Sequence, residues 1–89
     1  MELRRFWFRF ESLPKFTSLQ LGCGVTARDY EDALSILGET VFSRQTIPPI
    51  QNVIEDVDIG SLDQGHVVPN MEPPIFRGVW FPKGYTFLS

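Results

Sequence analysis

Hydrophobic and polar residues alternate at the start of the chain, over residues 3–11. Phe6, Phe8 and Phe10 occupy one set of positions, and the residues that flank and separate them are Arg5, Trp7, Arg9 and Glu11. An alternation of period two that is rich in aromatic residues is typical of a half-buried β-strand. The pattern predicts a strand whose phenylalanines face the core and whose Trp7 lies on the opposite face, among charged side chains.

A second alternation follows over residues 19–25 and predicts a strand antiparallel to the first. Leu19, Leu21, Cys23 and Val25 would face the core, whereas Gly22 and Gly24 would share the outer face. Glycine inside a strand often marks the close approach of other atoms. We expect Trp7 of the first strand to lie over this bare surface.

The next segment has the pattern of an amphipathic helix. Thr26 is a candidate N-cap with Asp29 three residues later, and acidic residues crowd the first turns, where the helix dipole favours negative charge. A stripe of period 3.6 is formed by Tyr30, Ala33, Leu34, Leu37 and Val41. The helix is predicted to end near residues 42–44 and to pack this stripe on the sheet.

The remaining chain predicts two more strands around a long loop. Residues 53–59 have mixed faces, which fits an edge strand, residues 60–76 are broken by glycine and proline, and residues 77–81 form a short strand. An apolar tail of Tyr85, Phe87 and Leu88 is expected to pack back on the core. We therefore expect a single α+β domain over residues 1–89, with a small antiparallel sheet of three to four strands and one helix on one face.

Charge is distributed unevenly along the 89 residues, whose formal net charge is −3. Residues 29–72 hold nine acidic side chains and one basic one, whereas residues 1–28 hold five basic and two acidic ones. The acidic segment is either a solvated surface that aids solubility or a surface that attracts a basic partner. A nucleic acid is not the expected partner, because a basic footprint is confined to Arg4, Arg5 and Arg9 around Trp7.

The composition also bears on the compartment. No segment approaches the roughly 18 apolar residues of a membrane span, and the N-terminus lacks the features of a signal peptide. One cysteine excludes an intrachain disulfide, which fits a reducing environment. We expect a cytoplasmic protein without a membrane partner.

Cys23 and His66 are the first candidates for chemistry. A thiolate nucleophile needs a base within hydrogen-bonding reach, and a following helix lowers the pKa of a nearby thiol. A small buried thiol on the core face is the alternative. The neighbouring sequence Gly22-Cys23-Gly24 lacks the spacing of a phosphate-binding loop.

The second candidate is the acidic segment of Glu55, Asp56, Asp58 and Asp63. Carboxylates bind hard cations, but the glycine and the terminal glutamate of a calcium-binding loop are missing here. We therefore expect neither a metal nor a cofactor. These side chains either dock on a partner or cap the turns around Gly60 and Gly65.

The third candidate is the proline-rich stretch of residues 66–74 with the following Arg77 and Trp80. Arginine and aromatic residues are typical anchors of protein interfaces. The alternative is a loop that its own aromatic residues pin to the core.

The chain resembles a family of small uncharacterised bacterial proteins. The resemblance rests on Gly22–Ala27, Val53–Ile59 and Arg77–Pro82. It implies a bacterial, intracellular protein that stands alone, and it implies no catalytic or binding residues.

The leading hypothesis is a non-enzymatic protein-binding module. Its concrete form is an acidic inhibitor or immunity-type protein that docks on a basic protein through Glu55, Asp56, Asp58 and Asp63, with Arg77 and Trp80 in the interface. One alternative is a small thiol-dependent enzyme that uses Cys23 and His66. The other is a homo-oligomeric structural protein that pairs through an edge strand or the C-terminal aromatic residues.

Overall fold

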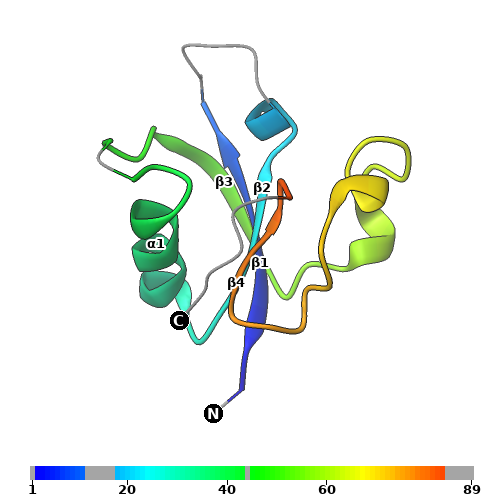
Figure 1. The fold of residues 1–89 in the computed structure, drawn as a ribbon, viewed down its shortest axis with the longest axis horizontal. Helices are drawn as coiled ribbons and strands as arrows, with labels where there is room; N and C mark the ends of the chain where they lie inside the picture. The colour runs from blue at the N-terminus through cyan, green and yellow to red at the C-terminus, as the bar shows by residue number, and fades with distance from the viewer. Residues whose placement is uncertain (1, 12–17, 44, 84–89) are drawn as a thin grey trace.

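The computed structural model describes residues 2–11, 18–43 and 45–83, and these form an α+β fold. Figure 1 shows a twisted sheet with the helix α1 on one side and the loop between β3 and β4 on the other. The elements are β1 (Arg4–Phe10), η1 (Ser18–Gln20), β2 (Cys23–Ala27), α1 (Tyr30–Glu39), β3 (Ile50–Glu55), η2 (Ile59–Ser61), η3 (Val68–Asn70) and β4 (Gly78–Phe81). The predicted fold class, with four antiparallel strands and one helix, is confirmed.

The strands are ordered β3-β1-β2-β4, and every neighbouring pair is antiparallel. The two long alternations therefore form the centre of the sheet, where Phe8 lies opposite Cys23 and Trp7 opposite Gly24. β3 is an edge strand, as predicted, and its register with β1 shifts between Arg9 and Phe10. Such a bulge is one way in which natural edge strands avoid pairing with other chains.

The helix-side core confirms the phenylalanine alternation. Phe6 and Phe8 are fully buried and Phe10 packs against them from a partly buried position. The helix and the facing strands complete this core with Ala33, Ile36, Leu37, Cys23, Val25 and Val79.

The opposite face of the sheet carries a second core; Trp7 lies on this face, as predicted, but the charged surroundings predicted for it were wrong. Trp7 is buried against Trp80 and Phe81, with ring centroids 5.8 and 5.7 Å away. The loop after β3 folds back over this face and adds Val57, Leu62 and Val67. The charged neighbours of Trp7 in the sequence therefore do not surround it in the fold.

The expected approach of Trp7 to the glycine surface is confirmed at one glycine. A side chain on Gly22 would overlap the Trp7 ring, and Gly22 has a φ of 130°, which favours glycine. Trp80, rather than Trp7, covers Gly24. The two indoles thus occupy the space that the two glycines leave open.

The start of β2 and the start of α1 differ from the prediction. Residues 18–20 form a 3-10 turn, so β2 begins at Cys23 and Leu21 is exposed. Thr26 lies inside β2, paired with Arg5 and Gly78, and does not cap the helix. The N-cap is Asp29, whose Oδ1 accepts a hydrogen bond from the Asp32 amide.

The helix is shorter than predicted and ends at Glu39, where the Thr40 amide donates to the Ile36 carbonyl. Ile36 joins the buried stripe, whereas Tyr30 is exposed at the first turn. Val41 lies beyond the helix but still packs against the core, as predicted.

β3 spans Ile50–Glu55 instead of residues 53–59, because the chain turns at Asp56, which has a φ of 54°. β4 begins one residue later than predicted, and the predicted loop over residues 60–76 contains the short turns η2 and η3. The predicted apolar tail of Tyr85, Phe87 and Leu88 lies outside the described residues. Within the described ranges, no helix has the length and apolar character needed to cross a membrane.

Candidate functional site

The sheet divides the acidic residues of the middle segment into separate groups. α1 and its N-cap carry Asp29, Glu31, Asp32 and Glu39 on one face of the sheet. Asp58 and Asp63 belong to the loop that covers the other face, and Glu55 and Asp56 lie between the groups, at the end of β3. The run of negative charge in the sequence is therefore not one continuous surface of the fold.

Glu55 and Asp56 lie beside Arg4 at the end of the sheet. The Arg4 Nη1 atom is 3.3 Å from Glu55 Oε1 and 3.8 Å from Asp56 Oδ2. All three side chains are about half exposed or more, so water and salt screen this pairing and it stabilises the fold only slightly. The three groups together keep a net negative charge that a partner can approach.

Asp58 and Asp63 cap turns, which is the structural alternative that the sequence left open. Asp58 Oδ1 accepts a hydrogen bond of 3.0 Å from the Gly60 amide. Asp63 Oδ1 accepts from the amides of Gly65 (2.8 Å) and His66 (3.0 Å). These amide bonds, together with the His66 ring 3.1 Å from Asp63 Oδ2, hold the pKa of Asp63 below its usual value. The carboxylates of Asp58 and Asp63 therefore have two properties: they fix the backbone of the loop after β3, and they are exposed to solvent.

The structure does not bring Cys23 and His66 together. Cys23 is fully buried in the helix-side core, and this burial raises the pKa of its thiol. His66 is exposed on a turn of the loop that covers the opposite face. The structure fits the alternative of a small buried thiol on the core face, to which the strand alternation directs Cys23, and does not fit the candidate pair of Cys23 and His66.

A shallow depression of about 330 Å³ lies next to His66. It is lined by His66, Asn70, Lys83, Leu21, Phe81 and Pro82. Cys23 is not among these residues, so the histidine has no thiol to activate there. Among the described residues, no group of three or more side chains is arranged to hold a metal ion.

Trp80 is 1% exposed and belongs to the second core. Its indole fills the space above Gly24 and packs β4 against β2. The ring is therefore not accessible to a binding partner. Its Nε1 atom is buried without a hydrogen-bond partner. Trp80 therefore does not fit the expected role of an interface anchor, and it fits the alternative, in which the aromatic residues hold their own segment against the core.

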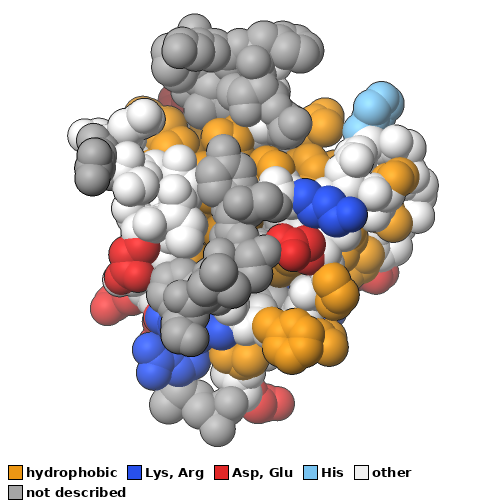
Figure 2. All heavy atoms as spheres, in the orientation of Figure 1, with side chains coloured by type: hydrophobic (Ala, Val, Ile, Leu, Met, Phe, Trp, Pro, Cys, Tyr) orange, Lys and Arg blue, Asp and Glu red, His pale blue; other side chains and the backbone are white. Residues whose placement is uncertain are grey.

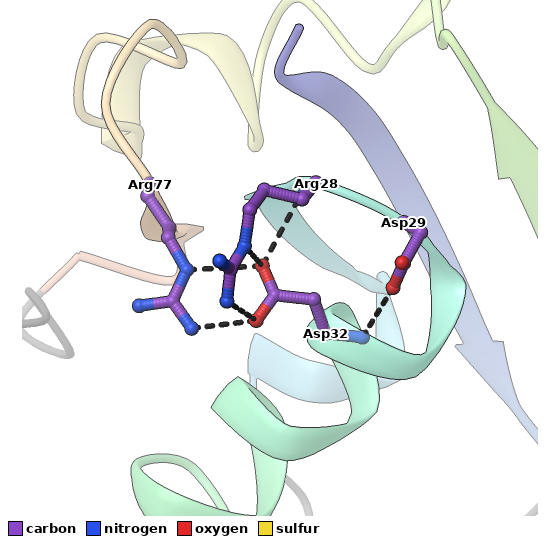
Figure 3. A network of polar contacts seen from close by, with 4 residues as sticks. All are labelled: Arg28, Asp29, Asp32 and Arg77. Atoms are coloured by element: carbon purple, nitrogen blue, oxygen red, sulfur yellow. Dashed lines mark hydrogen bonds and ion pairs between the residues drawn. The ribbon is translucent and has the colours of Figure 1, made fainter. Parts of the chain in front are cut away.

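Arg77 belongs to a cluster with Asp32 and Arg28, shown in Figure 3. Arg77 donates from both ends of its guanidinium to the Asp32 carboxylate, with a distance of 2.9 Å from Nε to Oδ2. The backbone amide of Arg28 donates to the same Asp32 Oδ2 atom over 3.0 Å. The side-chain Nε of Arg28 lies 3.4 Å from that oxygen. These bonds, chiefly those from Arg77, hold the pKa of Asp32 well below its usual value, although the burial of this carboxylate, which is 8% exposed, opposes the shift.

Sequence reasoning missed Ile75 and Phe76, which are 68% and 70% exposed. They lie between two fixed points. On one side Thr26 Oγ1 donates to the Pro74 carbonyl over 2.6 Å, and on the other Arg77 bonds with Asp32. The available signal was an apolar pair outside any alternating or helical pattern, directly after two prolines.

No family model, curated protein or solved structure matches this chain. The resemblance to small bacterial proteins consequently stays a prediction.

Proposed function

We propose that this chain is a non-enzymatic protein-binding module whose acidic segment, residues 55–63, docks on a basic surface of another protein. One observation supports the proposal above others: exposed carboxylates are held on a backbone that is already ordered by its own hydrogen bonds. Association costs less entropy when the contacting loop is ordered beforehand. An inhibitor or immunity-type protein acting on a basic enzyme, such as a nuclease, is the concrete form.

The electrostatics of such a surface set the expected behaviour. Complementary charges mainly accelerate encounter, and salt weakens the attraction between exposed groups. We expect binding that is fast at low salt and falls steeply as salt is added. Arg4 moderates the charge of Glu55 and Asp56 and becomes a secondary determinant of affinity.

The test uses variants that change charge and keep the backbone. Glu55→Lys combined with Asp56→Asn shifts the net charge by +3, and asparagine tolerates the left-handed conformation of residue 56. Asp58 and Asp63 are left intact because their loss would remove turn caps. The matched control, Glu31→Lys with Glu39→Gln, applies the same +3 shift on the helix.

The partner is captured from a host lysate at low salt, purified, and titrated against each variant. We expect Glu55→Lys/Asp56→Asn to weaken binding about tenfold at low salt, which corresponds to about 1.4 kcal/mol. The helix control should retain binding within about twofold, because distant exposed charges are screened. An equal loss in both variants would mean that only total charge matters, which contradicts a docking segment.

A further inference from the structure

One end of the sheet gathers apolar side chains that are open to solvent. Because neighbouring strands are antiparallel, β1 and β4 begin at this end, and β2 and β3 finish there. Three large apolar side chains that the described residues expose belong to this end, namely Leu3, Ile75 and Phe76. It is the lower end in Figure 1, and Figure 2 shows hydrophobic side chains there beside charged ones.

Ile75 and Phe76 are the most exposed of the three, and the loop that carries them is fixed. Thr26 is 2% exposed and holds the Pro74 carbonyl, while the buried Asp32 carboxylate holds Arg77. Further back, the Glu72 amide donates to the Trp80 carbonyl over 2.8 Å. The exposure of the two side chains is therefore built into the loop, and an ordered apolar protrusion of this kind is typical of an interaction surface.

The acidic end of β3 lies within reach of the same partner. Glu55 is the last residue of β3 and Gly78 is the first residue of β4, and these two strands form the opposite edges of the sheet. Three strand spacings of about 4.8 Å separate the two edges, so the distance across the sheet is roughly 14 Å. A standard interface covers about 800 Å² on each partner, a patch roughly 30 Å across. One docked protein can therefore contact both edges at once.

We propose that Ile75 and Phe76 are the apolar anchor of a docking surface whose acidic border is Glu55 and Asp56, and that its partner is a protein segment that presents aromatic or aliphatic side chains beside lysine or arginine. This inference rests on the proposed function and adds to it the contact that supplies most of the affinity. Anchors of interfaces are few, central and rigid, and the charges around them contribute mainly orientation and rate. The choice of partner follows from the pairing of an apolar protrusion with two carboxylates at the other edge of the same end of the sheet.

The probe is a display library of random twelve-residue peptides, selected on the immobilised protein. A parallel selection uses Ile75→Ser/Phe76→Ser, which changes only exposed side chains and is checked for an unchanged melting temperature. Enriched peptides are then synthesised and titrated. The control is Leu21→Ser, which removes an exposed apolar side chain at the opposite end of the sheet.

We expect enriched peptides that combine aromatic or aliphatic residues with lysine or arginine. They should bind Ile75→Ser/Phe76→Ser at least about tenfold more weakly, lose affinity for Glu55→Lys/Asp56→Asn at low salt, and bind Leu21→Ser normally. Peptides that respond only to Glu55→Lys/Asp56→Asn would overturn this inference and leave the proposed acidic docking standing.

Three other outcomes would also overturn it. The first is a set of peptides that respond to the loss of Ile75 and Phe76 but carry no basic residues and ignore Glu55 and Asp56, since the acidic border would then have no role. The second is a selection that enriches no peptide over the Ile75→Ser/Phe76→Ser background. The third is a dimer in light scattering that this double substitution dissociates, which would assign the loop to contact between copies of the chain.

Discussion

The same substitution, glycine to alanine, should have opposite effects at Gly24 and at Gly38. A Cβ atom on Gly24 would lie 2.5 Å from three carbons of the Trp80 ring, namely Cη2, Cζ2 and Cζ3. Carbon atoms in ordinary contact lie about 3.5–4.0 Å apart, so the ring or the strand would have to move by roughly 1 Å. A Cβ atom on Gly38, in the last turn of α1, would meet nothing within 4 Å.

The packing around Trp80 determines the size of the effect at Gly24. Trp80 is stacked on Trp7 and buried, so its ring has little room to retreat. Overpacking a core in this way lowers the free energy of unfolding by about 1–3 kcal/mol. Alanine loses less backbone entropy on folding than glycine does, which raises the free energy of unfolding by about 0.5–1 kcal/mol. We expect a net loss of about 1–2 kcal/mol for Gly24→Ala, whereas Gly38→Ala should gain about 0.4–1 kcal/mol.

Thermal unfolding followed by circular dichroism, with urea unfolding in parallel, measures both effects. In a domain of this length 1 kcal/mol shifts the melting temperature by about 4–8 °C, so the two variants should be clearly resolved. Trp80→Phe removes the part of the ring that a Gly24 Cβ would meet, so Gly24→Ala should cost less in that background. The reasoning is refuted if Gly24→Ala is as stable as the unchanged protein, or if its cost is the same with Phe at position 80.

Three further predictions concern the core, the ion cluster around Asp32 and the thiol. Phe8→Ala should lower the free energy of unfolding by about 3–5 kcal/mol, because Phe8 is fully buried, and a melting curve like that of the unchanged protein would contradict the core assignment. The depressed pKa of Asp32 means that its pairing with Arg77 stabilises the fold fully above the ordinary pKa of 3.8 and progressively less below it. The stability difference between the unchanged protein and Asp32→Asn should therefore shrink as the pH falls from 5 to 3, and a constant difference in urea unfolding would argue against this. Cys23 should resist iodoacetamide until the protein unfolds, and labelling of the native protein within minutes would show that the thiol is accessible.

The parts of the fold that the sequence predicts correctly are those that depend on local periodicity. Phe6 and Phe8 face the helix-side core, and because successive side chains of a strand point to opposite faces, this packing produces a repeat of period two in the sequence. The edge position of β3 was also recognisable, since Glu55 shares its strand face with Val53. Each of these features can be inferred from a window of about ten residues.

The errors occur where a distant segment competes with a local preference. Thr26 and Asp29 are both good N-cap residues, and the sequence favoured the earlier one. In the structure Thr26 pairs with Arg5 and Gly78 on either side and binds the Pro74 carbonyl, 48 residues away. Those contacts extend β2 to Ala27 and leave Asp29 to start the helix.

The candidate site shows the same limit. Turn capping by Asp58 and Asp63 was predictable, because such caps act over two or three residues. The separation of Cys23 from His66 depended on which face the long loop would cover, and nothing near either residue specifies that. The partner of Asp32 was equally hidden, because Arg77 lies 45 residues further along the chain.

The loop after β3 carries apolar residues of two kinds, some buried in the second core and some exposed to solvent. Its residues Val57, Leu62 and Val67 are buried over Trp7 and Trp80, so the second core accounts for their apolar character. Ile75 and Phe76 belong to the same loop and contribute little to either core, since about two thirds of each side chain remains in water. Two polar residues would serve the fold equally well at these positions, and would also remove an aggregation hazard. The docking contact proposed above accounts for their presence, and it predicts that the loss of Ile75 and Phe76 changes binding while stability stays the same.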